Sequence, residues 1–236
     1  MKEMSLSINT KDYDSAEETH PFYQEMVQEM LAQLKKHKKT KILELGAGTG
    51  LFTKKLLKIP GIKIDALEID EECFAYLKKK INGKNINLIE GDAVTYSKPG
   101  YYGAVVSCFA HDHTSSFKNR LVFAENLAKN LSKGGVYIVG QEIISEFKNK
   151  EGRRKALREF QGYIVWKAIQ DGHEKVAGLE LDSLKAAVEE KGDWKRHMKM
   201  FEEEMEHAGL KELFRKKIGP LDRENIGGVY VFVYQK

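Results

Sequence analysis

The sequence has few of the residues that mark secreted, membrane-spanning or disordered proteins. It contains 2 cysteines and 4 prolines in 236 residues, and 42% of the chain is hydrophobic. Two cysteines are too few for a disulfide framework, and this composition argues against disorder and allows a substantial core. No apolar run approaches the length that a bilayer requires, and the chain begins with the polar stretch Met1-Lys-Glu-Met4. We therefore expect a cytoplasmic protein.

The chain also lacks a strong charge of either sign. Its formal net charge is +4, which is too small to indicate a nucleic-acid partner. A basic groove would need arginines and aromatics interleaved on one face, and only Arg153, Arg154 and Arg158 come close. Cys73 and Cys108 lie in a predicted helix and a predicted buried strand, so we expect two reduced packing residues. We expect no nucleic-acid or membrane partner, and the sequence leaves the oligomeric state open.

The most informative feature that is present is Lys41-Ile-Leu-Glu-Leu-Gly-Ala-Gly-Thr-Gly50. The apolar residues before the glycines predict a buried parallel strand, and residues 51–57 have helical spacing. Glycines at positions 46, 48 and 50 remove the Cβ atoms that would keep a ligand from the backbone N–H groups. The following helix adds unpaired donors and a partial positive charge at its N-terminus. The sequence therefore predicts a loop that binds a nucleotide cofactor.

The pattern E-x-G-x-G-x-G, with Glu44 two residues before the first glycine, closely resembles motif I of the class I, Rossmann-like, S-adenosylmethionine (SAM)-dependent methyltransferases. A dinucleotide fingerprint, G-x-G-x-x-G, would instead need its last glycine at Leu51. Three more motifs follow in the family's order. Glu68 ends a predicted strand where a carboxylate binds ribose hydroxyls, Asp92 follows a third strand, and residues 109–114 follow a fourth strand.

The resemblance implies a SAM site, with S-adenosylhomocysteine as the product. In the family the Asp of the turn after the third strand receives the adenine amino group, and a Y-x-x-A stretch, here Tyr13 to Ala16, folds over the cofactor. The residues expected to bind the cofactor are Tyr13, Glu44, Gly46, Ala47, Gly48, Glu68, Ile69, Asp92, Ala93, Cys108 and Phe109.

Alternation of strands and helices predicts one α/β domain, a Rossmann-like, doubly wound, mostly parallel sheet. We expect strands near 41–45, 63–68, 86–90, 102–108 and 135–141, and helices near 50–58, 71–81 and 117–131. Residues 210–218 and 229–234 predict a terminal hairpin, which in the family completes a seven-stranded sheet with an antiparallel last strand.

The single domain, residues 1–236, is expected to have four parts. These are an N-terminal cap and helix (1–39), the SAM-binding core (40–141), a helical insertion (142–192), and a C-terminal helix and hairpin (193–236). Thr19 is expected to cap a helix that starts near Pro21. The insertion is expected to hold a helix around 154–169, a link punctuated by Gly172 and Gly178, and a short helix after Asp182. By the resemblance it forms a lid over the acceptor; plain helical decoration is the alternative.

Candidate acceptor residues follow the fourth and fifth strands, at the carboxyl edge where ligands bind in open α/β sheets. His111 or His113 is expected to be a catalytic base, with Asp112 orienting it, and alternation in a loop would let only one histidine reach the substrate. A metal site at these histidines lacks a third ligand at recognisable spacing, so no metal is expected. Polar or aromatic contacts to the acceptor are expected from Gln141, Glu142, Tyr163 and Trp166, although packing in the lid explains the aromatics equally well.

The resemblance implies methyl transfer by direct displacement from the SAM sulfonium to a bound nucleophile. The fourth strand ends in Ser107-Cys-Phe-Ala110 and lacks the Asn/Asp-Pro-Pro-Tyr sequence of enzymes that methylate adenine or glutamine amino groups. A small-molecule acceptor is therefore expected, with O, N, S and C atoms all open. Two alternatives stay open: a non-catalytic SAM-binding or partner-binding protein of the same fold, and, less favoured, an NAD-dependent oxidoreductase.

Overall fold

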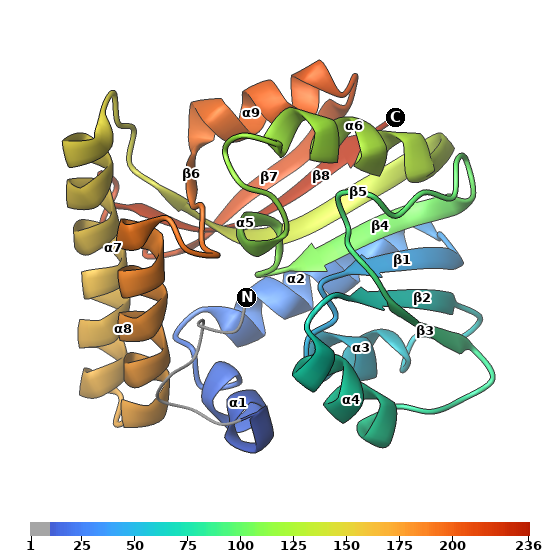
Figure 1. The fold of residues 1–236 in the computed structure, drawn as a ribbon, viewed down its shortest axis with the longest axis horizontal. Helices are drawn as coiled ribbons and strands as arrows, with labels where there is room; N and C mark the ends of the chain where they lie inside the picture. The colour runs from blue at the N-terminus through green and yellow to red at the C-terminus, as the bar shows by residue number, and fades with distance from the viewer. Residues whose placement is uncertain (1–9) are drawn as a thin grey trace.

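The computed structural model describes residues 10–236, so the predicted cap over residues 1–9 lies outside the described residues. The strands of the described chain are β1 (Lys41–Leu45), β2 (Lys63–Glu68), β3 (Ile86–Glu90), β4 (Tyr102–Cys108), β5 (Leu131–Ile144), β6 (Arg196–His197), β7 (Lys211–Gly219) and β8 (Gly227–Gln235). They form one sheet in the order β3-β2-β1-β4-β5-β8-β7, and the two-residue β6 pairs with the end of β5 (Figure 1).

Strand direction in this sheet matches the predicted fold class. The strands β1 to β5 pair in parallel, and β8 runs antiparallel to both β5 and β7. The Rossmann-like sheet with an antiparallel last strand is therefore confirmed. The short β6 is an addition that the sequence did not predict.

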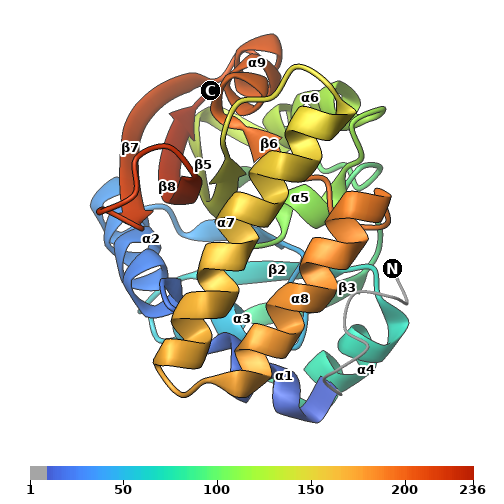
Figure 2. The same cartoon turned by 90° about the vertical axis from the view of Figure 1, so that its left-hand side faces the viewer.

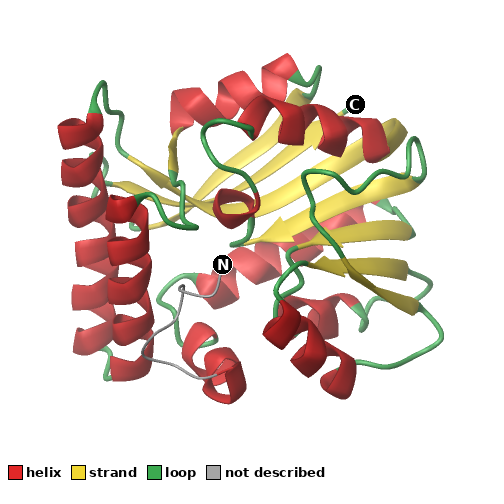
Figure 3. Ribbon diagram, in the orientation of Figure 1, coloured by secondary structure: helices red, strands yellow, loops and turns green. Residues whose placement is uncertain are grey.

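Helices cover both faces of the sheet and its carboxyl edge (Figure 3). The described helices are α1 (Thr10–Glu17), α2 (Tyr23–His37), α3 (Leu51–Leu56), α4 (Glu71–Lys80), α5 (His111–Thr114), α6 (Arg120–Asn130), α7 (Lys150–Gln170), α8 (Glu174–Glu189) and α9 (Met198–His207). One face carries α2, α3 and α4, and the opposite face carries α6 and α9. Among the described residues, no helix combines the length and the apolar character needed to cross a membrane.

Successive residues of the central strands pack into two different cores. In β4, Val106 belongs to the core under α2, whereas Val105 belongs to the core under α6 and α9. In β5, Ile138 and Val139 divide in the same way. Because both faces are buried, these strands appear in the sequence as continuous apolar runs, which made their positions predictable.

The predicted insertion forms an antiparallel helix pair, α7 and α8, that stands across the carboxyl edge of the sheet (Figure 2). The predicted short helix after Asp182 was wrong, because α8 already begins at Glu174 and includes Gly178. A glycine inside a helix costs only about 1 kcal/mol. Burial of Val176 and Ala177 beside Ala168 of α7 offsets that cost.

Two predicted helix starts also differ from the structure. The Thr19 hydroxyl donates to the Ala16 carbonyl at 2.7 Å, so it closes α1 and does not cap α2. The helix predicted at the start of the C-terminal part, 193–236, begins only at Met198. There the His197 ring Nδ1 accepts a hydrogen bond from the Met200 N–H at 3.2 Å, and residues 193–195 turn toward the interior.

Candidate active site

The glycine loop joins β1 to α3 in a left-handed backbone conformation. Gly46, Gly48 and Gly50 have φ angles of 65°, 53° and 85°, a region that other residues adopt only with strain. A Cβ on Gly46 would lie 2.5 Å from the Ala110 Cβ, whereas a Cβ on Gly48 would meet nothing within 4 Å. The loop is therefore packed against the end of β4 on one side and open on the other, as a ligand cradle requires.

Glu68 lies at the end of β2 directly beside this loop. Its carboxylate accepts backbone hydrogen bonds from Gly48 at 2.6 Å, from Asp70 at 2.7 Å and from Ile69 at 2.8 Å. Burial raises the pKa of Glu68, while these three hydrogen bonds favour its charged form. The hydrogen bond from Gly48 holds the open side of the loop to the end of β2. Glu68 also lies at the position where the resemblance implies a ribose-binding carboxylate.

The other predicted cofactor residues lie around the same loop and strand ends. Asp92 accepts the Val94 N–H at 2.8 Å in the turn after β3. Ala47 and Ala93 are buried, and Ile69 is 47% exposed. These positions fit a SAM molecule lying along the carboxyl ends of β1, β2 and β3, since Gly48 leaves space there and Glu68 and Asp92 supply acceptors.

Glu44 has a different environment from the rest of motif I. Its side chain is buried beneath the loop and accepts a hydrogen bond from the Thr53 hydroxyl of α3 at 2.7 Å. Burial raises the pKa of Glu44 to about 8. At neutral pH it is therefore mostly a neutral acid that ties β1 to α3.

Helix α1 closes over the glycine loop through one carboxylate. Asp14 accepts the Thr49 hydroxyl and pairs with the Lys80 ammonium, which also donates to the Thr49 carbonyl at 2.9 Å. Tyr13, the residue before Asp14, lines a cavity at the carboxyl ends of β4 and β5. The Y-x-x-A stretch therefore lies against the glycine loop, and its contact with a cofactor stays a prediction. Asp14 and Lys80, which hold it there, were missed in the sequence.

A cavity of about 70 Å³ lies at the carboxyl ends of β4 and β5, between α1, α5 and α8. Four lining residues are acidic and one is a lysine. The lining residues are Tyr13, Glu17, Phe109, Asp112, His113, Glu142, Leu179, Glu180, Ser183 and Lys195. Of these, Tyr13, Phe109, Asp112, His113 and Glu142 were predicted as site residues.

Charged side chains in the cavity are buried and only partly compensated. Lys195 pairs with Glu142 and lies 3.1 Å from the Asp193 carboxylate. Burial raises the pKa of Glu180 to about 8, and Glu142 beside it acts in the same direction. At neutral pH Glu180 is therefore mostly a neutral acid, whereas Glu142 is charged and paired with Lys195.

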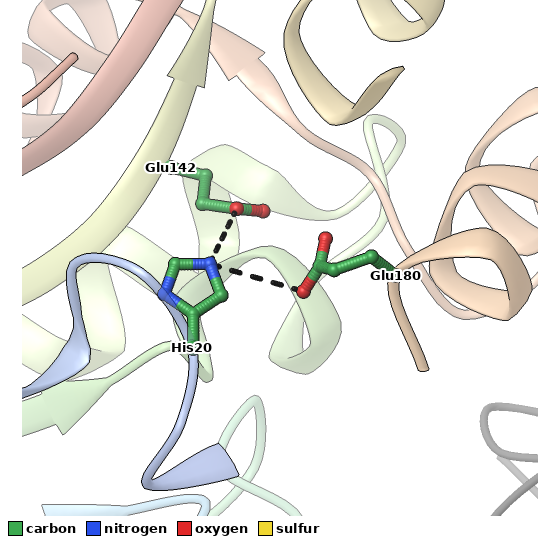
Figure 4. A group of neighbouring side chains, drawn as sticks. All are labelled: His20, Glu142 and Glu180. Atoms are coloured by element: carbon green, nitrogen blue, oxygen red, sulfur yellow. Dashed lines mark ion pairs between the residues drawn. The ribbon is translucent and has the colours of Figure 1, made fainter. Parts of the chain in front are cut away.

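His20 lies beside this cavity, between the two acidic side chains of Glu142 and Glu180 (Figure 4). Its Nε2 is 3.7 Å from a Glu142 oxygen and 3.9 Å from a Glu180 oxygen. Sequence reasoning missed His20, Glu180 and Lys195. A charged residue on the buried face of α8 was a usable signal for Glu180, because charges rarely face a core without a partner.

The two predicted histidines lie in different environments. His113 lines the cavity, and its Nδ1 lies 2.8 Å from the Gly192 carbonyl. Because a carbonyl only accepts, Nδ1 carries the proton and Nε2 keeps its lone pair. His111 has no exposed surface and contacts the Tyr137 hydroxyl at 2.9 Å and Glu204 at 3.1 Å. It packs under α6 and α9 and does not reach the cavity.

Asp112 lines the cavity but does not hold His113 in place, since Gly192 does so. The Asp112 Oδ1 atom has no hydrogen-bond partner among the described residues, and burial raises the pKa of this carboxyl to about 8. Gln141 is also buried, and both atoms of its amide lack a described hydrogen-bond partner.

Tyr163 and Trp166 lie away from the cavity, on α7. They line a separate hollow with Arg223 and Ile226, and Trp166 is 52% exposed. Trp166 faces outward and Tyr163 is half-buried against the core, because α7 turns its other face, including Phe160 and Ile164, to the interior. The structure thus does not bring these two predicted acceptor residues to the site.

Cys108 and Phe109 end β4 beside the cavity. Phe109 has a φ of 51°, and its ring lies 5.0 Å from the His20 ring. Burial raises the pKa of the Cys108 thiol well above its ordinary value, so this group is not a thiolate nucleophile. Both cysteines are unpaired, as predicted.

Comparison with known proteins places this geometry in a family. The model of the family described as ribosomal RNA adenine dimethylase matches residues 22–145. An uncharacterized methyltransferase of Bacillus thuringiensis (strain Al Hakam) is 29% identical over 105 residues, covering 44% of this chain and 48% of that protein. The chain thus matches about half the length of this curated relative.

Solved methyltransferases share the fold over almost the whole chain. A SAM-dependent methyltransferase from Leishmania major has a TM-score of 0.62 at 14% identity, with 93% of this chain and 73% of that chain covered. The N-methyltransferase NodS from Bradyrhizobium japonicum WM9 has a TM-score of 0.60 at 14% identity, with 92% and 97% covered. The chain belongs to the ribosomal RNA adenine dimethylase family, a family with the class I fold of SAM-dependent methyltransferases.

Proposed function

We propose that this protein transfers a methyl group from SAM to a small-molecule acceptor bound in the cavity between α1, α5 and α8. The observation that carries this proposal is the position of the cavity. Phe109 and Asp112 line it at the end of β4, and Ala110 between them contacts the glycine loop. An acceptor in the cavity would thus lie next to a cofactor held by the loop.

The expected cofactor residues would hold SAM with its methionine part near Gly46 and Gly48, its ribose near Glu68 and its adenine near Asp92. When bound, SAM supplies an electrophilic methyl group. The protein's contribution is mainly positioning, because a methyl transfer in line with the sulfonium requires an oriented acceptor. A lid role is proposed for the α7 and α8 pair, since α8 contributes Leu179, Glu180 and Ser183 to the cavity wall and would shelter a bound acceptor from water.

His113 is the proposed base for an acceptor that must lose a proton. The Gly192 carbonyl fixes its tautomer, so Nε2 is the nitrogen available to accept a proton. His111 is proposed to have a structural role, because both of its ring nitrogens are already bonded inside the core.

A second candidate acceptor is an adenine of RNA, which the family description favours. Two observations favour the small molecule. Residues 107–110 at the end of β4 read Ser-Cys-Phe-Ala, without the sequence used by enzymes that methylate adenine amino groups. The cavity itself is small, about 70 Å³, which is room for fewer non-hydrogen atoms than an adenine base contains.

Calorimetric titration with SAM, S-adenosylhomocysteine and NAD tests the cofactor assignment, with Glu68→Ala as the variant. We expect the first two to bind and Glu68→Ala to weaken them at least tenfold. Binding of NAD alone would support the oxidoreductase alternative. Incubation with labelled SAM and either a metabolite extract or ribosomal RNA then tests the acceptor class, and label in the RNA fraction alone would refute the small-molecule proposal.

The two histidines provide matched variants for the base assignment. We expect His113→Gln to lower kcat at least a hundredfold, because general base catalysis contributes about 10²–10⁴-fold. We expect His111→Gln to lower the unfolding midpoint while the folded fraction keeps its kcat. Equal turnover of wild type and His113→Gln would contradict the base role. SAM binding without label transfer to any acceptor would favour the non-catalytic alternative.

A further inference from the structure

We propose that the acceptor is a small aliphatic amine, bound in its ammonium form by the carboxyl groups of Asp112, Glu142 and Glu180. This inference rests on the proposed function and names the substrate class of the same cavity. It is carried by unpaired acceptor atoms, by the sign of the charge around the cavity and by the hydrogen bonding of His20.

Three carboxyl groups at the cavity each have an oxygen without a hydrogen-bond partner among the described residues. These atoms are Asp112 Oδ1, Glu142 Oε1 and Glu180 Oε2, on side chains whose residues are 4%, 6% and 7% exposed. Two of them have a basic neighbour beyond hydrogen-bond distance, since Arg196 Nη1 lies 4.0 Å from Asp112 Oδ1 and His20 Nε2 lies 3.7 Å from Glu142 Oε1. A buried carboxyl oxygen without a partner is costly, so the site is incomplete without a ligand that donates hydrogen bonds. An ammonium group offers two or three N–H donors and no acceptor.

The charge of the cavity points to the same ligand. Glu17, Asp112, Glu142 and Glu180 line it together with one cation, Lys195, which is already paired with Glu142 and Asp193. Burial raises the pKa of Asp112 and of Glu180 to about 8, so an acceptor without positive charge would leave both carboxyls mostly protonated. A cationic acceptor would favour their charged forms, and the Tyr13 and Phe109 rings in the wall also favour a cation.

A divalent metal ion is the competing cation, because His20, Glu142 and Glu180 place three possible ligand atoms within 4.8 Å of one another (Figure 4). The hydrogen bond of the His20 Nδ1 argues against it. The Phe22 N–H donates to Nδ1 at 3.2 Å, so in the neutral ring the proton is on Nε2. That proton occupies the lone pair that a metal would need and instead points toward the two glutamates.

The size of the cavity limits the amine. A water molecule needs about 10–15 Å³ of such space. The volume of about 70 Å³ therefore holds on the order of five non-hydrogen atoms, as in a short primary or secondary alkylamine.

The bound ammonium must lose one proton before its nitrogen can attack the methyl group. The ammonium gives one N–H proton to the His113 Nε2 atom, which leaves a neutral amine with a free electron pair. That pair forms the new N–C bond with the methyl carbon as the C–S bond breaks and its electrons remain on sulfur. The N-methylated ammonium leaves with S-adenosylhomocysteine, and the proton on His113 passes to water when the products leave.

Binding can be tested without turnover, using the full chain with S-adenosylhomocysteine present. The probes are ethylammonium and dimethylammonium chloride, with ethanol, acetate and Mn²⁺ for comparison, and calorimetry or ligand-observed NMR gives the Kd. We expect the two amines to bind and ethanol and acetate not to bind. Glu180→Gln should weaken amine binding at least tenfold. Glu174→Gln, exposed in the first turn of the same helix α8, is the matched control and should leave the Kd unchanged.

Each other outcome has a defined meaning. Mn²⁺ binding that is lost in Glu180→Gln, with no binding of either amine, would overturn the inference. Amine binding that Glu180→Gln and Asp112→Asn leave unchanged would also overturn it. So would methyl transfer to an alcohol or thiol alone, although the proposed function would then stand. Amine binding without methyl transfer from SAM would refute the proposed function and leave the amine site. Circular dichroism of each variant confirms that loss of binding is not loss of fold.

Discussion

Replacing Glu44 with glutamine tests the interpretation of this motif I acid as a neutral, buried link between β1 and α3. In the folded chain burial raises its pKa from an ordinary value of 4.5 to about 8, and the Thr53 hydroxyl donates to it at 2.7 Å. A glutamine side chain has nearly the same shape, and its amide oxygen can accept the same hydrogen bond. Glutamine does not titrate.

The sign of the effect follows from proton binding. Between pH 4.5 and pH 8 the folded state keeps a proton on Glu44 that the unfolded state has lost, so this group makes the wild type less stable as pH rises. With these two pKa values, the wild type loses about 2.5 kcal/mol relative to Glu44→Gln between pH 5 and pH 7. A further loss of about 1.3 kcal/mol follows between pH 7 and pH 9.

Urea unfolding of both proteins at pH 5, 7 and 9 measures this difference. The subtraction removes the titration of all other groups, which both proteins share. Glu71→Gln, exposed in the first turn of α4, is the control and should show no such dependence on pH. A difference between wild type and Glu44→Gln that stays constant from pH 5 to pH 9 would refute the reasoning, because Glu44 would then be ionised in the folded state.

Three further predictions concern the parts that hold the site. Gly46→Ala places a Cβ 2.5 Å from a neighbouring Cβ, so we expect it to cost about 1–3 kcal/mol more in urea unfolding than Gly61→Ala, which has a similar φ but open space. Glu204→Ala removes the buried partner of Arg196 at 3.0 Å, and we expect a loss of about 3–5 kcal/mol in unfolding free energy. Asp14→Asn removes the charge that ties α1 over the glycine loop, and we expect faster proteolysis within α1 by limited digestion without a lower unfolding midpoint.

The central strands could be predicted from the sequence because both of their faces are buried. β1, β2 and β4 span 41–45, 63–68 and 102–108, as the apolar runs predicted. Strands that are buried on both faces appear as continuous apolar runs, so their positions can be predicted from local composition. The start of α9 could not be predicted, because residues 193–197 have helical spacing but contact distant groups. Arg196 alone bonds to Ser115 at 2.7 Å and to Glu204.

The proposed cofactor residues were easier to locate from the sequence than the residues of the cavity, for a related reason. The loop needs glycines because its backbone is left-handed, and Glu68 is the acidic residue that ends the next strand. Each can therefore be recognised within a short segment of the sequence. The acceptor cavity combines His20, Glu142, Glu180 and Lys195 from four segments, and no local spacing joins positions up to 175 residues apart. Glu142 was predicted only because it ends a strand at the carboxyl edge.

The pair His111 and His113 shows what local geometry can and cannot decide. Two residues apart on a helix lie about 200° around its axis, so α5 sends one ring into the core and the other to the cavity. Extended backbone would place residues two apart on the same face, so the expected alternation was the wrong reason, and it is the helix that leaves only one of the two rings lining the cavity. Which one does so depends on Glu204 and Gly192, 93 and 79 residues away, because each fixes the ring nearest to it. Tertiary contacts therefore decide which ring lines the cavity, and a variant at Gly192 that moves its carbonyl would affect His113 and leave His111 in place.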